Sequence, residues 1–399
     1  MEQTWRWFGP QDGVTLEHAR QAGATGIVTA LHDIPYGVVW SVEAIEARKA
    51  EIARNPALGL HWSVAESLPV HEAIKIGEGD LEPLFEAYRV SLRNLAACGV
   101  TTVCYNFMPV LDWARTELVH PLPGGGRALR FNAHEFAAFD AFMLERSGAE
   151  ADHPPDVMVR ARAWFDRSTA ADRDALLATV MAGLPGAFDR YDIAGLRGML
   201  ALYRDVSTER LRENLVRFLR AVIPAAEEAG LRMAIHPDDP PRPLLGLPRI
   251  VSTAEDLAFI VEAVDSVANG ITLCSGSLGA SPRNDVVAIA RHFASRIHFA
   301  HLRNVSNEPD GSFMEADHLD GDTDMIALVE VLLDEQAKRR DAGEPRWRIP
   351  MRPDHGHELL GDVGQTGHHP GYSATGRLKG LAELRGVMRT LSRTRGVPL

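Results

Sequence analysis

The sequence is poor in cysteine, in long apolar runs and in net positive charge. Its 3 cysteines, Cys98, Cys104 and Cys274, form an odd and sparse set that does not predict a disulfide framework. No apolar run approaches the ~20 residues that a membrane-spanning helix needs. The N-terminus also lacks the charged-then-apolar pattern of a signal peptide. We therefore expect a protein of the reducing cytoplasm without a membrane partner.

The formal net charge of -12 excludes another class of partner. An acidic surface repels phosphate backbones, so we expect no nucleic-acid partner, and a phosphodiester-cleaving enzyme is disfavoured. A small anion bound in a cleft remains compatible with this charge. Hydrophobic residues make up 45% of the chain and charged residues 24%, which is the usual balance for a globular protein.

Short apolar runs alternate with amphipathic segments along the chain. The near-continuous apolar character of these runs favours parallel strands that are covered on both faces. The predicted strands are Thr4–Phe8, Gly26–Leu31, Leu60–Glu66, Thr101–Met108, Arg232–Pro237, Gly270–Gly276, Ile297–Arg303 and Arg348–Pro353. The predicted helices between and after them are Ser41–Ala53, Asp80–Cys98, Thr208–Ala229, Thr253–Val267, Asn284–Ala294, Asp322–Arg340 and Arg377–Thr394.

Strand followed by helix, repeated about eight times, is typical of a (β/α)8 TIM barrel. A doubly wound open sheet is the alternative, but it usually has fewer strands and often a glycine-rich first turn. We therefore predict an α/β fold in which residues 1–399 form a single TIM-barrel domain.

Residues 111–206, between the fourth and fifth strands, are too many for one crossover. They contain a Pro-Leu-Pro-Gly-Gly-Gly-Arg stretch and several helical patterns. We interpret them as a helical insertion at the C-terminal face of the barrel, where lids and subunit contacts are common. A partly independent subdomain is the other interpretation.

Four successive strands end in residues that can bind a metal. His236, Cys274, His301 and Asp354 follow or end strands five to eight, and the C-terminal ends of barrel strands converge on one rim. Each residue alone has a structural explanation, but their coincidence favours a metal site. One thiolate, two imidazoles and a carboxylate suit Mn²⁺, Fe²⁺, Co²⁺ or Zn²⁺ better than Mg²⁺ or Ca²⁺.

At these residues the sequence resembles the mannonate dehydratase family, the lyases of hexuronate (glucuronate) catabolism, over essentially the whole chain. The resemblance rests on motifs that are jointly specific, among them His32-Asp-Ile-Pro-Tyr-Gly, Cys104-Tyr-Asn-Phe-Met-Pro-Val-Leu-Asp-Trp, His236-Pro-Asp-Asp-Pro-Pro, Phe299-Ala-His-Leu-Arg-Asn-Val, Arg352-Pro-Asp-His-Gly-His and Pro370-Gly-Tyr-Ser-Ala-Thr-Gly-Arg. Tyr36 and the Gly-Gly-Gly stretch depart from the family pattern, which affects the substrate rim more than the chemistry.

The resemblance implies a xylose-isomerase-like TIM barrel that binds Mn²⁺ or Fe²⁺ and is a homo-oligomer. The implied reaction removes water from D-mannonate to give 2-keto-3-deoxy-D-gluconate. The positions that match the family's metal ligands are the four residues already reached from the strand ends.

This chemistry requires a base for the C2 proton and an acid for the C3 hydroxyl, which is a poor leaving group. His355, next to Asp354, is the candidate base, although it could instead orient Asp354. Tyr372, in a loop after strand eight, is the candidate acid, although it could simply pack over the barrel mouth. The two roles could also be exchanged.

Three further residues are predicted to contact the substrate. Arg303 lies two residues past His301, hence on the same side of the strand, and its guanidinium could bind the substrate carboxylate. A salt bridge to an acidic loop residue is its structural alternative. Asn106 and Trp7 lie on other strands, and Trp7 could equally be barrel packing.

Two alternative functions use the same scaffold. A metal-dependent sugar or sugar-acid isomerase or epimerase shares the fold, the ion and the polyol, and only its product would differ. A non-catalytic sugar-acid-binding protein is less favoured, because binding alone does not require a complete acid–base set.

Overall fold

The computed structural model describes residues 1–182 and 191–397, and it contains a closed eight-stranded parallel barrel. All eight predicted strands are confirmed, each within a few residues. In order around the barrel they are β1 (Glu2–Arg6), β12 (Pro350–Arg352), β9 (Ile297–His301), β8 (Asn269–Cys274), β7 (Arg232–Ile235), β4 (Thr102–Tyr105), β3 (His61–Glu66) and β2 (Gly26–Thr29). Strands that are neighbours in the barrel therefore succeed one another in the sequence, as in a (β/α)8 fold.

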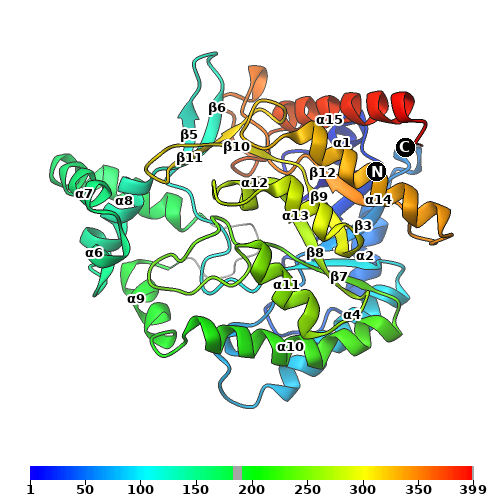
Figure 1. The fold of residues 1–399 in the computed structure, drawn as a ribbon, viewed down its shortest axis with the longest axis horizontal. Coiled ribbons are helices and arrows are strands. Elements are labelled where there is room, and N and C mark those ends of the chain that lie inside the picture. The colour runs from blue at the N-terminus through cyan, green and yellow to red at the C-terminus, as the bar shows by residue number, and fades with distance from the viewer. Residues whose placement is uncertain (183–190, 398–399) are drawn as a thin grey trace.

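Helices follow the barrel strands and cover the barrel from outside (Figure 1). The helix that begins after Ser41 is capped, because the Ser41 hydroxyl accepts a hydrogen bond from Ala44 N. The main helices are α1 (Leu16–Ala22), α2 (Val42–Ile52), α4 (Glu82–Ala97), α10 (Thr208–Glu228), α11 (Ala254–Ala263), α13 (Val286–His292), α14 (Met325–Asp341) and α15 (Ala374–Arg395). The shorter ones are η1 (Pro56–Leu58), α3 (Glu72–Ile76), α12 (Ser275–Gly279), η3 (Ala294–Arg296) and η4 (Leu360–Asp362).

The chain leaves the barrel after β4 and rejoins it at α10. The helices of this segment are α5 (Ala133–Ala138), the π-helical turn η2 (Phe139–Met143), α6 (Ala149–Asp152), α7 (Pro155–Arg167), α8 (Ala170–Val180) and α9 (Ile193–Leu202). Helices α6 to α9 gather on one side of the molecule (Figure 1). Residues 183–190, inside the predicted insertion 111–206, lie outside the described residues.

The insertion also contains a hairpin that the sequence did not predict. Strands β5 (Glu117–Pro121) and β6 (Arg127–Phe131) pair with each other, and β6 pairs with β11 (Phe313–Ala316), which pairs with β10 (Asn304–Asn307). This four-stranded sheet connects the insertion to the segment that follows β9. The backbone hydrogen bonds of this sheet therefore hold the insertion at the rim of the barrel.

Separate hydrophobic clusters stabilise the two parts. A large cluster of buried residues fills the space between the strands and the surrounding helices, and a second one joins the insertion to segments that follow β7, β8 and β9, with Leu244, Ala280 and Val305 among its members. Inside the barrel, a small apolar layer consists of Val28, Val64, Cys104, Ala234 and Phe299. Among the described residues, no helix is long and apolar enough to cross a membrane.

Candidate active site

Three of the four predicted metal ligands come together at one rim. His236 follows β7, Cys274 ends β8 and His301 ends β9, and their ligand atoms all lie within 4.8 Å of one another. Because parallel neighbours in the barrel bring their carboxyl ends to the same level, residues 38 and 27 positions apart in sequence form one group.

Asp354, the fourth predicted ligand, borders this group. Its Oδ1 lies 3.8 Å from Nδ1 of His301, and its Oδ2 lies 3.7 Å from Sγ of Cys274. Asp354 has a backbone φ of 66°, which is the left-handed region that non-glycine residues rarely adopt. Burial alone would raise the pKa of this carboxyl group, but the Arg352 guanidinium, 2.5 Å away, holds it well below its ordinary value. The carboxylate is therefore ionised, as a metal ligand must be.

The donor set fits a divalent transition metal. Nδ1 of His236 donates to the carbonyl oxygen of Pro237 at 2.7 Å, which leaves the lone pair of Nε2 free, 3.1 Å from Nδ1 of His301. Burial lowers the pKa of His236, so its imidazole stays neutral. The other ring nitrogen of His301, Nε2, has no hydrogen-bond partner and lies 3.6 Å from Oε2 of Glu66. Imidazoles whose second nitrogen faces an oxygen are typical of metal ligands.

His355 is held by a carboxylate from another strand. Its Nδ1 lies 2.7 Å from Oε1 of Glu315 in β11. A carboxylate only accepts hydrogen bonds, so Nδ1 carries a proton, and Nε2 is the ring nitrogen left for proton transfer. Arg303 Nη1 also lies 2.9 Å from this Nδ1, but a guanidinium group is a donor and cannot accept the Nδ1 proton. Burial would raise the pKa of Glu315, but His355 and Arg303 hold it at about 2.

Tyr372 lies against His355. The two ring centroids are 4.9 Å apart and the rings are nearly perpendicular, at 73°. Burial raises the pKa of Tyr372 to about 12, so the phenol keeps its proton at neutral pH. The arrangement places an imidazole and a protonated phenol side by side at the rim.

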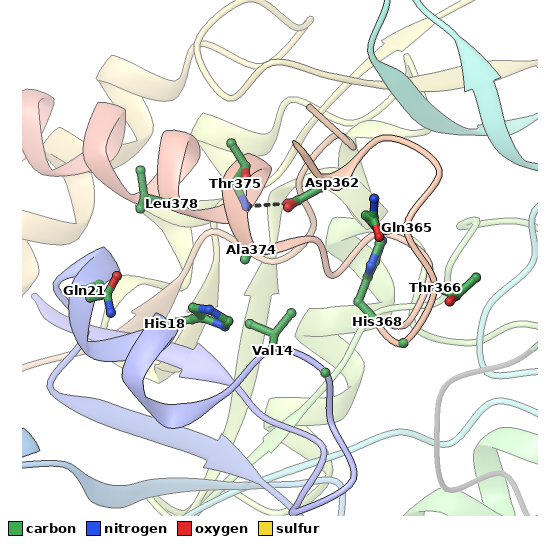
Figure 2. A pocket seen from close by; sticks show the side chains of 12 residues that line it. Val14, His18, Gln21, Asp362, Gln365, Thr366, His368, Ala374, Thr375 and Leu378 are labelled. Atoms are coloured by element: carbon green, nitrogen blue, oxygen red, sulfur yellow. Dashed lines mark hydrogen bonds between the residues drawn. The ribbon is translucent and has the colours of Figure 1, made fainter. Parts of the chain in front are cut away.

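The loop that carries Tyr372 is fixed by contacts with the loop after β1. The Phe8 ring lies 4.3 Å from the His369 ring and 4.8 Å from the Tyr372 ring, and Gly13 N donates to the Gly367 carbonyl oxygen. Behind this loop, a cavity of about 360 Å³ separates it from α1 (Figure 2). The cavity is lined by none of the predicted site residues.

Arg303 is at the centre of a buried ion-pair network. Its Nη2 lies 2.6 Å from Oδ2 of Asp239, and its Nη1 lies 3.2 Å from Oε1 of Glu315. Arg115, from the insertion, contacts the same two carboxylates at 2.7 and 2.8 Å. Burial would raise the pKa of Asp239, but the two arginines hold it far below its ordinary value. The salt-bridge alternative for Arg303 therefore describes its contacts in this structure.

The other two predicted substrate residues lie at different depths. Trp7 follows β1, is buried, belongs to the barrel's hydrophobic core and lies under the Arg48 guanidinium. Asn106 follows β4 and is half-buried, and its side-chain oxygen accepts from Met108 N at 3.4 Å. Substrate contact by either residue stays a prediction.

Comparison with known proteins agrees with this geometry. The family profile described as D-mannonate dehydratase (UxuA) matches residues 1–397. The chain is 56% identical to the mannonate dehydratase of Chromohalobacter salexigens over 388 residues, which are 97% of this chain and 98% of that protein. It is 51% identical to that of Saccharophagus degradans over 98% of both chains.

The chain belongs to the D-mannonate dehydratase family. The crystal structure of mannonate dehydratase from Streptococcus suis serotype 2 superposes on this D-mannonate dehydratase family member with a TM-score of 0.77 at 35% identity, covering 100% of this chain and 95% of that one. The predicted family and fold are confirmed.

Sequence reasoning missed several residues that hold the site together. Glu66 ends β3, and its carboxylate pairs with Arg352 at 2.8 Å and lies 3.6 Å from Nη1 of Arg6. Glu66 ends a predicted strand and Arg352 is the second-last residue of another, so extending the strand-end argument to every strand would have found both. Glu315 lies in β11, which no sequence pattern indicated, and its role is visible only in three dimensions.

Proposed function

We propose that this chain dehydrates D-mannonate to 2-keto-3-deoxy-D-gluconate in cytoplasmic hexuronate catabolism, with Mn²⁺ or Fe²⁺ as its cofactor. One observation carries the proposal: a group of metal donors lies at the same rim as a carboxylate-held histidine and a protonated tyrosine. Membership of the family supports the same reaction. An isomerase on this barrel would share the metal donors but not the family.

His236, Cys274, His301 and Asp354 would hold the ion. A mixed nitrogen, sulfur and oxygen donor set favours a transition metal over Mg²⁺ or Ca²⁺. A bound divalent ion would offset the negative charge that develops on the substrate carboxylate when the C2 proton leaves.

His355 and Tyr372 would carry the two proton transfers. Nε2 of His355 takes the C2 proton, and the electrons of that bond form the C2–C3 double bond. Tyr372 donates its proton to the C3 hydroxyl, which leaves as water. The resulting enol tautomerises to the 2-keto-3-deoxy acid. The two residues could also exchange these roles, but Tyr372 would then have to act as a phenolate, which its raised pKa disfavours.

Arg303, Asn106 and Trp7 would contact the sugar acid. The Nη groups of Arg303 are engaged with Asp239 and Glu315, and its Nε lies 3.4 Å from Oδ2 of Asp354, so a substrate oxygen would compete with these carboxylates for the guanidinium. Asn106 would bind a hydroxyl group, and Trp7 would contact the carbon face of the sugar.

We also propose that residues 1–399 form one domain whose 111–206 insertion covers the C-terminal mouth of the barrel, and that the protein is a homo-oligomer. The ion pairs of Arg115 with Asp239 and Glu315 support the first statement, because they join the insertion to the rim.

The decisive experiment measures formation of 2-keto-3-deoxy acid from D-mannonate by chelator-treated protein, with and without added Mn²⁺. We expect product only after the metal is restored. Metal-loaded protein that forms no product would contradict the proposed substrate, and product formed without metal would contradict the proposed cofactor.

A further inference from the structure

The indole N–H of Trp113 is buried without a hydrogen-bond partner. Trp113 lies in the segment between β4 and β5, and its side chain is only 5% exposed. An indole nitrogen can only donate, and a buried donor without an acceptor is costly and rare in native proteins. The unpaired N–H therefore needs an explanation.

The position of this indole is fixed beside the proposed base. Its ring centroid lies 6.1 Å from that of His355, with the rings perpendicular at 88°. The Arg115 guanidinium lies 4.9 Å from the centroid of the Trp113 ring, and the next residue, Ala114, donates its backbone N–H to the Asp239 carbonyl oxygen. The donor is thus held in place at the rim before any substrate arrives.

Two other buried tryptophans provide a comparison. Trp62 donates its indole N–H to the Val64 carbonyl oxygen at 2.9 Å. Trp5 also has an unpaired N–H, but its ring packs under the Arg377 guanidinium, between the barrel and α15. Among these three, Trp113 alone combines an unpaired donor with contact to a proton-transfer residue.

We propose that the Trp113 indole N–H donates a hydrogen bond to an oxygen of the sugar-acid substrate and so holds the reacting carbon against His355. This inference rests on the proposed function. The acceptors of a sugar acid are its hydroxyl and carboxylate oxygens. Glu315 and Arg303, the charged groups that contact His355, are already paired with each other, and Arg303 is also paired with Asp239, whereas the Trp113 donor is still available.

The substitution Trp113→Phe tests this contact, because it removes the N–H and keeps an aromatic face toward Arg115. We expect kcat/KM for D-mannonate to fall about tenfold, as for the loss of one hydrogen bond, with metal content unchanged. Trp62→Phe is the matched control. Trp62 is the second residue of β3, at the opposite end of the barrel from the site, so this variant should lose some thermal stability but keep its kcat/KM.

An NMR measurement separates substrate contact from a structural effect. The indole ¹⁵N–¹H resonance of Trp113 is the one that is missing from the spectrum of Trp113→Phe. In Zn²⁺-loaded wild-type protein, this resonance should shift when D-mannonate is added to saturation. A resonance that stays in place at saturation, or a variant with wild-type kcat/KM, would overturn the inference. Wild-type protein that neither binds nor converts D-mannonate would instead overturn the proposed function.

Discussion

The two halves of the rim are built differently. On the metal half, the ring nitrogens of His236 and His301 and the sulfur of Cys274 face one another, and the carboxylates of Glu66 and Asp354 lie at the edge of the group, 3.6 and 3.8 Å from His301. On the acid–base half, His355 stands in a buried network of full charges, with Glu315 beside it and Arg303 behind. One half offers lone pairs, and the other half holds a single ring in one orientation.

The difference follows from what each half must do. A metal ligand needs a free lone pair, so neutral imidazoles are favoured and strong hydrogen bonds to the ligand atoms are not. A proton acceptor needs a defined tautomer, which a buried carboxylate fixes. Such a carboxylate is tolerated only if arginines compensate its charge, which explains why Arg115 and Arg303 both contact Glu315.

Cys274→Ser should have the largest effect, and it is confined to the metal half. A hydroxyl is a poor replacement for a thiolate ligand, so metal content should fall and activity should drop about a thousandfold, the equivalent of the several kcal/mol that a bound metal supplies. The barrel should stay folded, as judged by circular dichroism. Unchanged metal content and turnover would exclude Cys274 as a ligand.

Asp239→Asn should mainly reduce stability. It leaves the buried guanidinium groups of Arg115 and Arg303 without one of the two carboxylates that they share, and breaking a buried pair in this way costs about 3–5 kcal/mol. Glu308→Gln is the control, because the Glu308–Arg130 pair is partly exposed and should contribute at most about 1 kcal/mol. Chemical denaturation measures both. Equal losses in the two variants would refute the distinction between buried and exposed pairs.

Glu315→Gln should separate the two halves functionally. The variant weakens the hold on the His355 tautomer, so kcat should fall about ten- to a hundredfold, as for other groups that orient a functional histidine. Metal content should remain that of the wild type, because Glu315 does not contact His236, Cys274 or His301 through any described hydrogen bond or ion pair. A parallel loss of metal would show that the halves are not independent.

The barrel and the metal half could be predicted from the sequence because their signals are local. Each strand is a short apolar run, and a ligand at a strand end is assigned to the rim by the fold alone. The same argument placed His236, Cys274, His301 and Asp354 at the rim, where the structure brings the first three together and places Asp354 at their border.

The acid–base half depends on pairing that no local pattern reveals. Glu315 reaches His355 only because β11 pairs with β6 of the insertion, a strand far away in the chain. The Gly-Gly-Gly turn indicated a break within residues 111–206, but its charged five-residue flanks gave no clear strand alternation, so the hairpin was missed. Helix α1 was also missed, because its seven residues are too few to show a clear helical period.

Glu135, in helix α5 of the insertion, sharpens the comparison with the smallest expected effect. At the rim, arginines hold the pKa of Glu315 at about 2, whereas burial and the nearby charge of Glu117 raise the pKa of Glu135 to about 7. An acid whose pKa is raised in the folded state binds its proton more tightly there than in the unfolded chain. Its contribution to the free energy of unfolding is therefore lost as pH rises from about 4.5 to about 7.

Glu135→Gln should remove this pH dependence. The variant should be as stable as the wild type near pH 5 and more stable by about 1–2 kcal/mol at pH 8, a value reduced from the full shift because the side chain is partly exposed. Urea denaturation at the two pH values measures the difference, and Glu150→Gln at an exposed site provides the control. A stabilisation of equal size at both pH values would mean that Glu135 is ionised at both. Burial in the insertion would then not raise the pKa of this carboxyl group.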